Sequence, residues 1–219
     1  MASQPIENGE AEGPAPAGLA FPAGETVDAQ VRRAQAGDEE AFDGLVRAFG
    51  GVVYNLAYRM TGNAADADDV AQEVFVKLYR SIRQYRWQAK FSTWLYALAA
   101  NTCRSALRKL RRVAEAEPVS LNAEPADGRA RPDPSDPGEL PGQTLERKEL
   151  RAQVEAAMAE LPDEFRMVIV LRDLQGLAYE EIAAALACTV GTVKSRLARA
   201  RQRVKEKLVR QGVVCAAIE

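Results

Sequence analysis

The residue types that most often carry enzymatic chemistry are scarce in this sequence. It contains no histidine, which removes the commonest general base and metal ligand. Its three cysteines, Cys103, Cys188 and Cys215, are far apart and form no CxxC pair, so neither a zinc site nor a redox motif is indicated. Any catalytic site would therefore depend on carboxylates, cysteine or lysine.

One group of carboxylates that could hold a metal lies between positions 66 and 73. Its members are Asp66, Asp68, Asp69 and Glu73. Their spacing does not match a calcium-binding loop, and no general base or oxyanion site accompanies them or Cys103. Acidic residues in the first turn of a helix stabilise its dipole, which is a sufficient explanation for the group. We therefore expect no enzymatic activity, no catalytic residues, no metal site and no cofactor.

The basic residues are a second group that could carry function, by binding nucleic acid. Lysine and arginine total 29 against 31 aspartate and glutamate residues, a net charge of -2, but the charges are segregated along the chain. Basic residues gather at positions 104–112 and 194–210. Such stretches on an otherwise acidic chain are typical of a nucleic-acid-binding surface. A solvated helix that contacts nothing is the alternative for either stretch taken alone.

The C-terminal basic stretch lies on the second of two predicted helices. Apolar spacing predicts a helix over 178–186, a break over 187–189, and a helix from Val190 with Thr189 as its N-cap. Two helices joined by so tight a turn are typical of a helix-turn-helix.

Helical periodicity turns one stripe of the second helix toward the core: Val193, Leu197, Ala200, Val204 and Leu208. Its exposed face carries Thr192, Ser195, Arg196, Arg199 and Arg203. Hydroxyl side chains followed by arginines suit the major groove, guanine edges and phosphates.

Two further stretches are predicted to carry function in the N-terminal half. The helix that starts at the acidic group has an apolar face of Val70, Val74, Phe75, Leu78 and Ile82, and an opposite face of Asp69, Gln72, Glu73, Val76 and Arg80. An exposed valine inside a charged patch is typical of a protein interface.

Aromatic residues and a basic helix follow. The aromatic residues are Tyr85, Trp87, Phe91, Trp94 and Tyr96; the helix, with Ser92 as its expected cap, carries a polar stripe of Asn101, Arg104, Arg108 and Arg111. Aromatic rings beside cations suit single-stranded DNA, because bases stack while phosphates are neutralised nearby. We expect the rings of Phe91 and Trp94 in the core, and Tyr85, Trp87 and Lys90 in a loop facing the strand.

The elements that position these residues predict an all-α protein with two small helical domains joined by a flexible, proline-rich linker. The predicted ranges are 1–25 for a disordered extension, 26–112 for the first domain, 113–144 for the linker, 145–211 for the helix-turn-helix domain, and 212–219 for a tail. At about 3.1 Å per residue the linker would span on the order of 90 Å. With neither a basic, apolar leader nor a run of about 18 apolar residues, we expect a cytoplasmic protein without membrane insertion.

Both halves resemble the extracytoplasmic-function (ECF) family of bacterial sigma factors. The C-terminal resemblance, to sigma region 4, rests on Leu161-Pro162-Asp163-Glu164-Phe165-Arg166, Leu171-Arg172, Gly176-Leu177, Tyr179-Glu180-Glu181-Ile182-Ala183 and Val190-Gly191-Thr192-Val193-Lys194-Ser195-Arg196-Leu197. The N-terminal resemblance, to region 2, rests on the helix that begins at Asp66 and on Phe91-Ser92-Thr93-Trp94-Leu95-Tyr96 with Asn101. Three positions depart from the family's usual pattern. Ala178 replaces a hydroxyl residue, Trp87 a frequent glycine, and Ser105 a common aspartate.

The resemblance implies a factor that binds core RNA polymerase, directs it to promoters and helps melt the minus-ten region. It assigns the following residues to core polymerase: Asp69, Gln72, Glu73 and Val76. To the opened minus-ten strand it assigns Tyr85, Trp87, Lys90, Asn101, Arg104 and Arg108. To the minus-thirty-five duplex it assigns Gly191, Thr192, Lys194, Ser195, Arg196, Arg199 and Arg203. The implied partners are the β′ clamp helices and β flap of core polymerase, promoter DNA in duplex and single-stranded form, and an anti-sigma factor.

A helix-turn-helix regulator that binds an operator as a homodimer is the alternative. It would explain the C-terminal half, but it leaves the acidic helix and the aromatic cluster of the N-terminal half without a role.

Overall fold

The computed structural model describes residues 25–116 and 144–213, and within these ranges every regular element is helical. The first half contains α1 (Val27–Gln35), α2 (Glu39–Thr61), α3 (Ala64–Ser81), the 3₁₀ turn η1 (Ile82–Gln84) and α4 (Phe91–Ala116). The second contains α5 (Thr144–Ala159), α6 (Asp163–Ile169), the π-helical turn η2 (Val170–Leu174), α7 (Tyr179–Ala185) and α8 (Val190–Arg210). The predicted all-α class is confirmed. No helix of these ranges is long and apolar enough to cross a membrane.

Side-chain caps set where the N-terminal helices begin. Asp38 accepts a hydrogen bond from the backbone N–H of Ala41 at 3.1 Å, and Asn63 accepts one from Asp66 at 2.8 Å. Gly62 ends α2 in the left-handed region, at φ +83°, which lets α3 begin two residues later. The tight turn therefore lays α3 back against α2.

The predicted boundaries of α4 differ from those observed. α4 begins at Phe91, so Ser92 lies inside the first turn and is not the cap that we expected. It continues to Ala116, which makes the first four residues of the predicted linker helical. Residues 117–143 of that linker, all but one residue of the predicted N-terminal extension, and most of the predicted tail lie outside the described residues, whereas Thr144 begins α5.

Apolar stripes of α2, α3 and α4 form the core of the first half. α3 buries Val70, Val74 and Leu78, as its predicted apolar face requires. Large side chains that are almost completely buried include Leu45, Phe49, Leu56 and Met60 of α2 and Phe91 of α4. Burying such side chains is the main favourable contribution to folding.

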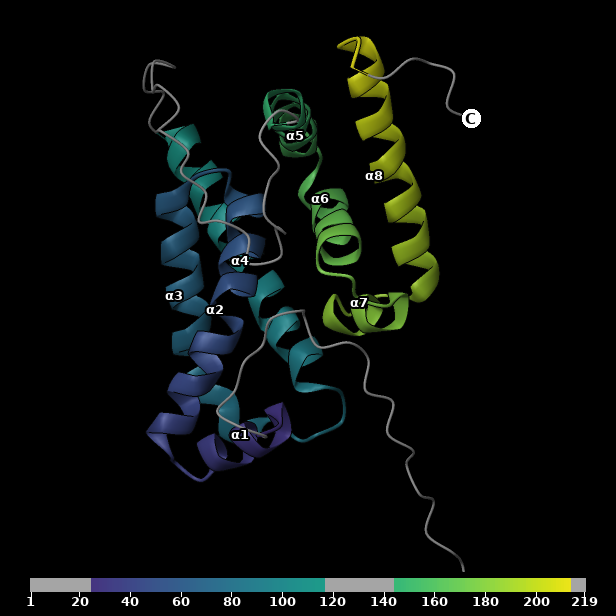
Figure 1. The fold of residues 1–219 in the computed structure, drawn as a ribbon. Helices are drawn as coiled ribbons and strands as arrows, with labels where there is room; N and C mark the ends of the chain where they lie inside the picture. The colour runs from purple at the N-terminus through teal and green to yellow at the C-terminus, as the bar shows by residue number, and fades with distance from the viewer. Residues whose placement is uncertain (1–24, 117–143, 214–219) are drawn as a thin grey trace, which may run out of the picture.

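The two halves lie against each other (Figure 1): α7 packs on α4, while α5 and α6 contact α2. Their buried apolar residues form one continuous cluster. Polar contacts across the junction are Arg59 with Glu155 at 2.8 Å, Lys90 with Glu181 at 3.1 Å, Arg111 with Asp163 at 2.6 Å, and Tyr96 with Gln175 at 3.3 Å. Sequence patterns predicted two domains; the structure adds that they share an interface.

Arg166 of α6 is a half-buried cation at this junction. Its guanidinium donates to the backbone carbonyls of Met158, Ala159 and Leu161 in its own half, and to that of Met60 in α2 at 2.8 Å. Burial is the main reason that the pKa of Arg166 is lowered. This side chain satisfies carbonyls at the ends of both α5 and α2, so it couples the two halves.

Candidate nucleic-acid and polymerase interfaces

α7 and α8 form the predicted helix-turn-helix. The turn between them passes through Ala187, whose φ of +51° is in the left-handed region, and Cys188 donates a backbone hydrogen bond to Ala183 at 3.0 Å. Thr189 then caps α8 by accepting a hydrogen bond from the N–H of Thr192 at 3.1 Å. The predicted helix, break and cap therefore fall where the structure has them.

The faces of α8 follow the predicted periodicity. Val193, Leu197, Ala200 and Leu208 are buried on the side of α8 that packs against α5, α6 and α7, with Val204 half-buried. Exposed on the other side are Gly191, Lys194, Ser195, Arg199 and Arg203. This leaves a polar, basic surface along one side of a capped helix, which is the geometry that a major groove accepts.

Five predicted contact residues of α8 make contacts within the protein, among them Lys194 over the ring of Tyr179 at 5.8 Å and Ser195, whose hydroxyl donates to the carbonyl of Thr192 at 3.0 Å. Arg196 is half-buried and pairs with Glu164 of α6 at 2.8 Å. Arg203 lies over the ring of Phe165 at 5.0 Å, and Thr192 shares a 2.9 Å hydrogen bond with the Thr189 hydroxyl. Helical periodicity alone could not reveal Glu164 and Phe165 as partners, because both belong to α6, which is separated from α8 by η2 and α7.

The loop between η1 and α4 presents Trp87 but buries Tyr85. Trp87 is 37% exposed and has φ +61°, in the left-handed region that glycine adopts freely and other residues rarely do. Tyr85 is only 6% exposed, and its hydroxyl donates to the carbonyl of Ala89 at 2.6 Å. Burial raises the pKa of Tyr85 to about 12. Our expectation that Tyr85 faces a DNA strand is corrected: its ring packs inside the loop, against Trp87, Phe91 and Trp94.

The exposed side of α4 carries the remaining residues predicted to meet single-stranded DNA. Asn101, Arg104 and Arg108 are all exposed, and Arg104 donates to the Asn101 side chain at 3.1 Å. Lys90, at the end of the loop, is also exposed and pairs with Glu181 of α7. Lys90 directly precedes α4, and the stripe that begins at Asn101 lies ten residues, or about 15 Å, further along the same helix.

The outward face of α3 has the predicted composition. Asp69, Gln72 and Glu73 are exposed, and Val76 is 41% exposed. The structure adds Tyr79, which is 59% exposed and was not among the predicted residues. Its position three residues after Val76 was the available signal, because residues three apart share a helix face.

No cluster of three or more histidine, cysteine, aspartate or glutamate side chains suited to a metal ion occurs in the described ranges. Burial raises the pKa of the Cys103 thiol to about 12, which suits a structural thiol rather than a nucleophile. An exposed recognition helix and an aromatic loop beside a basic helix define the class as a DNA-binding protein with two helical domains.

Comparison with known proteins identifies the family. Residues 45–113 match the family model of sigma-70 region 2, and residues 151–204 match that of sigma-70 region 4. The chain is 38% identical over 180 residues to RNA polymerase sigma-H factor of Pseudomonas aeruginosa, covering 81% of this chain and 91% of that one. It is 39% identical over 180 residues to ECF RNA polymerase sigma-E factor of Escherichia coli K12, covering 81% and 92%.

A solved structure of CnrH in complex with the cytosolic domain of CnrY is also similar, with a TM-score of 0.59 and 27% identity over 83% of this chain and 96% of that one. The chain belongs to the ECF family of RNA polymerase sigma factors, which direct core polymerase to promoters and initiate transcription there. The alternative of an operator-binding regulator is not favoured, because the region 2 match covers the half that it leaves unexplained.

Proposed function

We propose that the three exposed surfaces of this sigma factor divide promoter recognition among them, and that the basic face of α8 reads the minus-thirty-five duplex. The residues assigned to this contact are Gly191, Thr192, Lys194, Ser195, Arg196, Arg199 and Arg203. The observation that carries the proposal is the exposed row of Lys194, Ser195 and Arg199 directly behind the Thr189 cap. The N-terminal part of such a helix enters the major groove, where serine and arginine can bond base edges and phosphates.

The loop and α4 are proposed to hold the unpaired minus-ten strand. Trp87 offers a partly exposed ring on which a base can stack, while Lys90, Asn101, Arg104 and Arg108 supply charge and hydrogen bonds along the same side. Tyr85 supports the loop from inside. Stacking beside cations favours a melted strand over a duplex, because the bases must leave their own stack to reach the ring.

The face of α3 is proposed to bind the clamp helices of the polymerase β′ subunit. Asp69, Gln72 and Glu73 surround Val76, so an apolar contact would be ringed by polar groups. Tyr79 extends this face by about one helical turn. The second domain is assigned to the β flap by its family resemblance.

An anti-sigma factor is a further proposed partner, since the similar protein CnrH was solved in complex with a second protein. Because core polymerase is its partner, we propose a cytoplasmic location for this sigma factor. Its role is that of a specificity subunit rather than an enzyme.

Transcription in vitro tests these assignments. Core polymerase, with and without the purified chain, is supplied with a pool of genomic fragments. We expect start sites that appear only with the chain and share two elements about 20 base pairs apart, a spacing typical of two contacts about 70 Å apart on one duplex. If no such transcripts appear and the chain does not co-elute with core polymerase, the proposal is overturned.

Variants then separate the three surfaces. Val76→Asp is expected to abolish co-elution with core polymerase, because it buries a charge in the contact. Arg199→Ala is expected to spare co-elution and weaken binding to the upstream duplex, whereas Arg104→Ala should spare both and reduce melting, measured by permanganate reactivity of thymines. The same defect in all three variants would contradict separate roles.

A further inference from the structure

α1 lies outside the region 2 match, which begins at residue 45, and none of its residues was predicted to contact DNA. In the structure it nevertheless contacts η1 and the loop that follows it. We propose that α1 is part of the single-strand-binding surface, with Arg32 as a further DNA contact and Gln35 as a positioning residue for the loop. The ligand is an unpaired base with its flanking phosphate. This inference rests on the proposed role of the loop.

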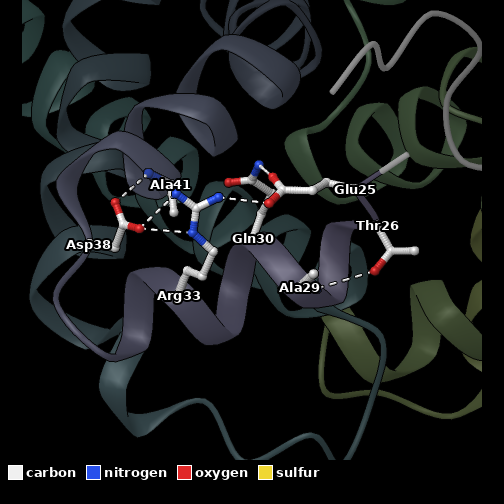
Figure 2. A network of polar contacts seen from close by, with 7 residues as sticks. All are labelled: Glu25, Thr26, Ala29, Gln30, Arg33, Asp38 and Ala41. Atoms are coloured by element: carbon white, nitrogen blue, oxygen red, sulfur yellow. Dashed lines mark hydrogen bonds and ion pairs between the residues drawn. The ribbon is translucent and has the colours of Figure 1, made fainter. Parts of the chain in front are cut away.

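The position of α1 is set by a network of polar contacts at the corner between α1 and α2 (Figure 2). Arg33 pairs with Glu25 at 2.7 Å and with Asp38 at 2.8 Å, and Asp38 also caps α2 through the N–H of Ala41. Gln30 is buried and donates to Glu25. The same arginine therefore joins Glu25, two residues before α1, to Asp38, the N-cap of α2, and this helps to orient α1.

Gln35, at the C-terminal end of α1, ties the loop to this fixed helix. Its side-chain nitrogen donates to the carbonyls of Ile82 and Tyr85, each at 2.9 Å. The other end of the loop is closed by the Tyr85 hydroxyl, which donates to Ala89. Both N–H donors of the Gln35 amide thus bond to backbone carbonyls where the loop leaves η1. Gln35 therefore orients the loop and is not itself a DNA contact.

Arg32 lies on the exposed part of α1 and covers Trp87. Its guanidinium carbon is 5.0 Å from the centre of the Trp87 ring, and the Tyr85 ring lies 4.9 Å from the same ring. An exposed cation–π contact is weaker than the stacking of a nucleic-acid base on an aromatic side chain. An incoming base is therefore able to displace the guanidinium from Trp87, which leaves Arg32 beside the phosphate of that nucleotide.

The arrangement also explains how a tryptophan is tolerated in a left-handed backbone conformation. Gln35 holds the backbone two residues before Trp87, and contacts with Arg32 and Tyr85 hold the ring. A residue with φ +61° persists only where its surroundings determine its conformation. α1 supplies two of these constraints, and both lie next to the ring that is proposed to receive a base.

Binding of a fluorescent single-stranded probe tests Arg32. The probe carries the non-template strand of a promoter defined by the transcription experiment, and it is titrated into the complex of core polymerase with the full chain over a range of salt concentrations. Arg32→Ala is expected to weaken binding by about five- to tenfold and to lower the slope of log affinity against log salt by about 0.7, the value for one phosphate contact on a single strand. Arg32→Lys should retain the slope, and Arg47→Ala, an exposed arginine of α2, should match the wild type.

Weaker binding of Arg32→Ala with an unchanged salt slope would restrict Arg32 to holding Trp87 and overturn the contact. Unchanged affinity would also overturn it. Absence of binding by the wild-type complex would instead count against the proposed role of the loop, so the two failures are distinguishable.

Base preference tests Gln35. The same titration uses probes with each of the four bases at every minus-ten position in turn. Gln35→Met, which keeps the length of the side chain and removes both hydrogen bonds, is expected to reduce the ratio between the best and worst base at one position by about fivefold or more, with unchanged affinity for the upstream duplex. An equal loss for all four bases would mean a purely structural role and overturn the positioning claim.

Discussion

Arg196 shows how a residue predicted for DNA binding is affected by a neighbour that the sequence pattern did not reveal. Its ion pair with Glu164 holds the guanidinium at one side of α8, half-buried. A partly exposed pair of this kind contributes little to stability, at about 0 to 1 kcal/mol. The pair is thus weak enough for a phosphate or guanine to replace Glu164, and strong enough to orient the side chain beforehand.

Arg196→Ala is expected to weaken binding of the upstream duplex by about 1 to 3 kcal/mol and to relax sequence preference at one base pair, if Arg196 contacts a base. Competition binding against duplexes with single base changes measures both effects. Glu164→Gln is the matched control, because it removes the competing carboxylate and should leave specificity intact. A loss that is equal on all sequences would reassign Arg196 to a phosphate.

The carboxylate of Asp38 has two partners, the N–H of Ala41 and the guanidinium of Arg33. The N–H of Ala41 and the Arg33 guanidinium lower the pKa of Asp38 below its ordinary 3.8, and the same pairing raises the pKa of Arg33. A lowered carboxyl pKa contributes stability that is present above the ordinary value and is lost as the pH falls through the lowered one. Asp38→Asn retains a cap but loses the charge, so its destabilisation relative to the wild type should be present at pH 5 and shrink toward about pH 2. Urea unfolding of both proteins at these pH values is the measurement; a difference independent of pH would contradict it.

At the scale of the element, α7 has only half of its N-terminal cap. The Glu181 side chain accepts a hydrogen bond from the backbone N–H of Ala178 at 2.9 Å, but Ala178 has no oxygen to return one to the helix. Its backbone already has the extended conformation of a cap, with φ -67° and ψ 156°. The departure from the family's hydroxyl residue is therefore a missing atom rather than a different fold of the turn.

Ala178→Ser is expected to stabilise the protein by about 1 kcal/mol, since it completes the reciprocal pair of hydrogen bonds at the start of α7. Denaturant unfolding monitored by circular dichroism measures the change. Ala178→Val keeps a side chain without a hydrogen-bond acceptor, so it should give no gain. Equal stabilisation by both substitutions would show that the cap is not the cause.

At the scale of the whole molecule, the two halves are too close for both promoter elements to be bound at once. Lys90 and Glu181 are 3.1 Å apart across the junction, and α7 leads directly into α8. Two elements about 20 base pairs apart lie roughly 70 Å apart along a duplex. Engagement of both elements on one promoter thus requires the halves to separate, which breaks the contacts of Arg59, Arg111 and Arg166.

A cross-link between the halves tests this requirement. Arg59→Cys and Glu155→Cys place thiols at a contact outside the proposed DNA surfaces; Cys188 and Cys215 are replaced by serine. Cys103 is retained, because its buried thiol, with a pKa of about 12, reacts slowly with maleimides. A short, reducible bis-maleimide is expected to lower promoter-dependent transcription by about tenfold or more, with recovery after reduction. Each single-cysteine variant controls for the reagent, and full activity of the cross-linked protein would contradict separation.

Helical periodicity was sufficient to predict several local features of this protein, although not the start of α4. The buried stripe of α8, the Thr189 cap and the exposed face of α3 depend on residues within one or two turns of each other, so they can be read from spacing alone. The family resemblance extended this to the order of the two domains and the expected surfaces for polymerase and DNA, which were expectations about position rather than contact.

The tertiary structure alone decided which of these residues meet one another. The ring of Tyr85 lies inside the loop because it packs with Phe91 and Trp94. The side chain of Gln35, 50 positions earlier in the chain, donates to the backbone carbonyl of Tyr85. The shared interface of the two halves brings Arg166 to Met60, 106 positions away. Such contacts depend on how whole helices dock, and docking is the sum of many small packing and hydrogen-bond free energies that no local spacing records.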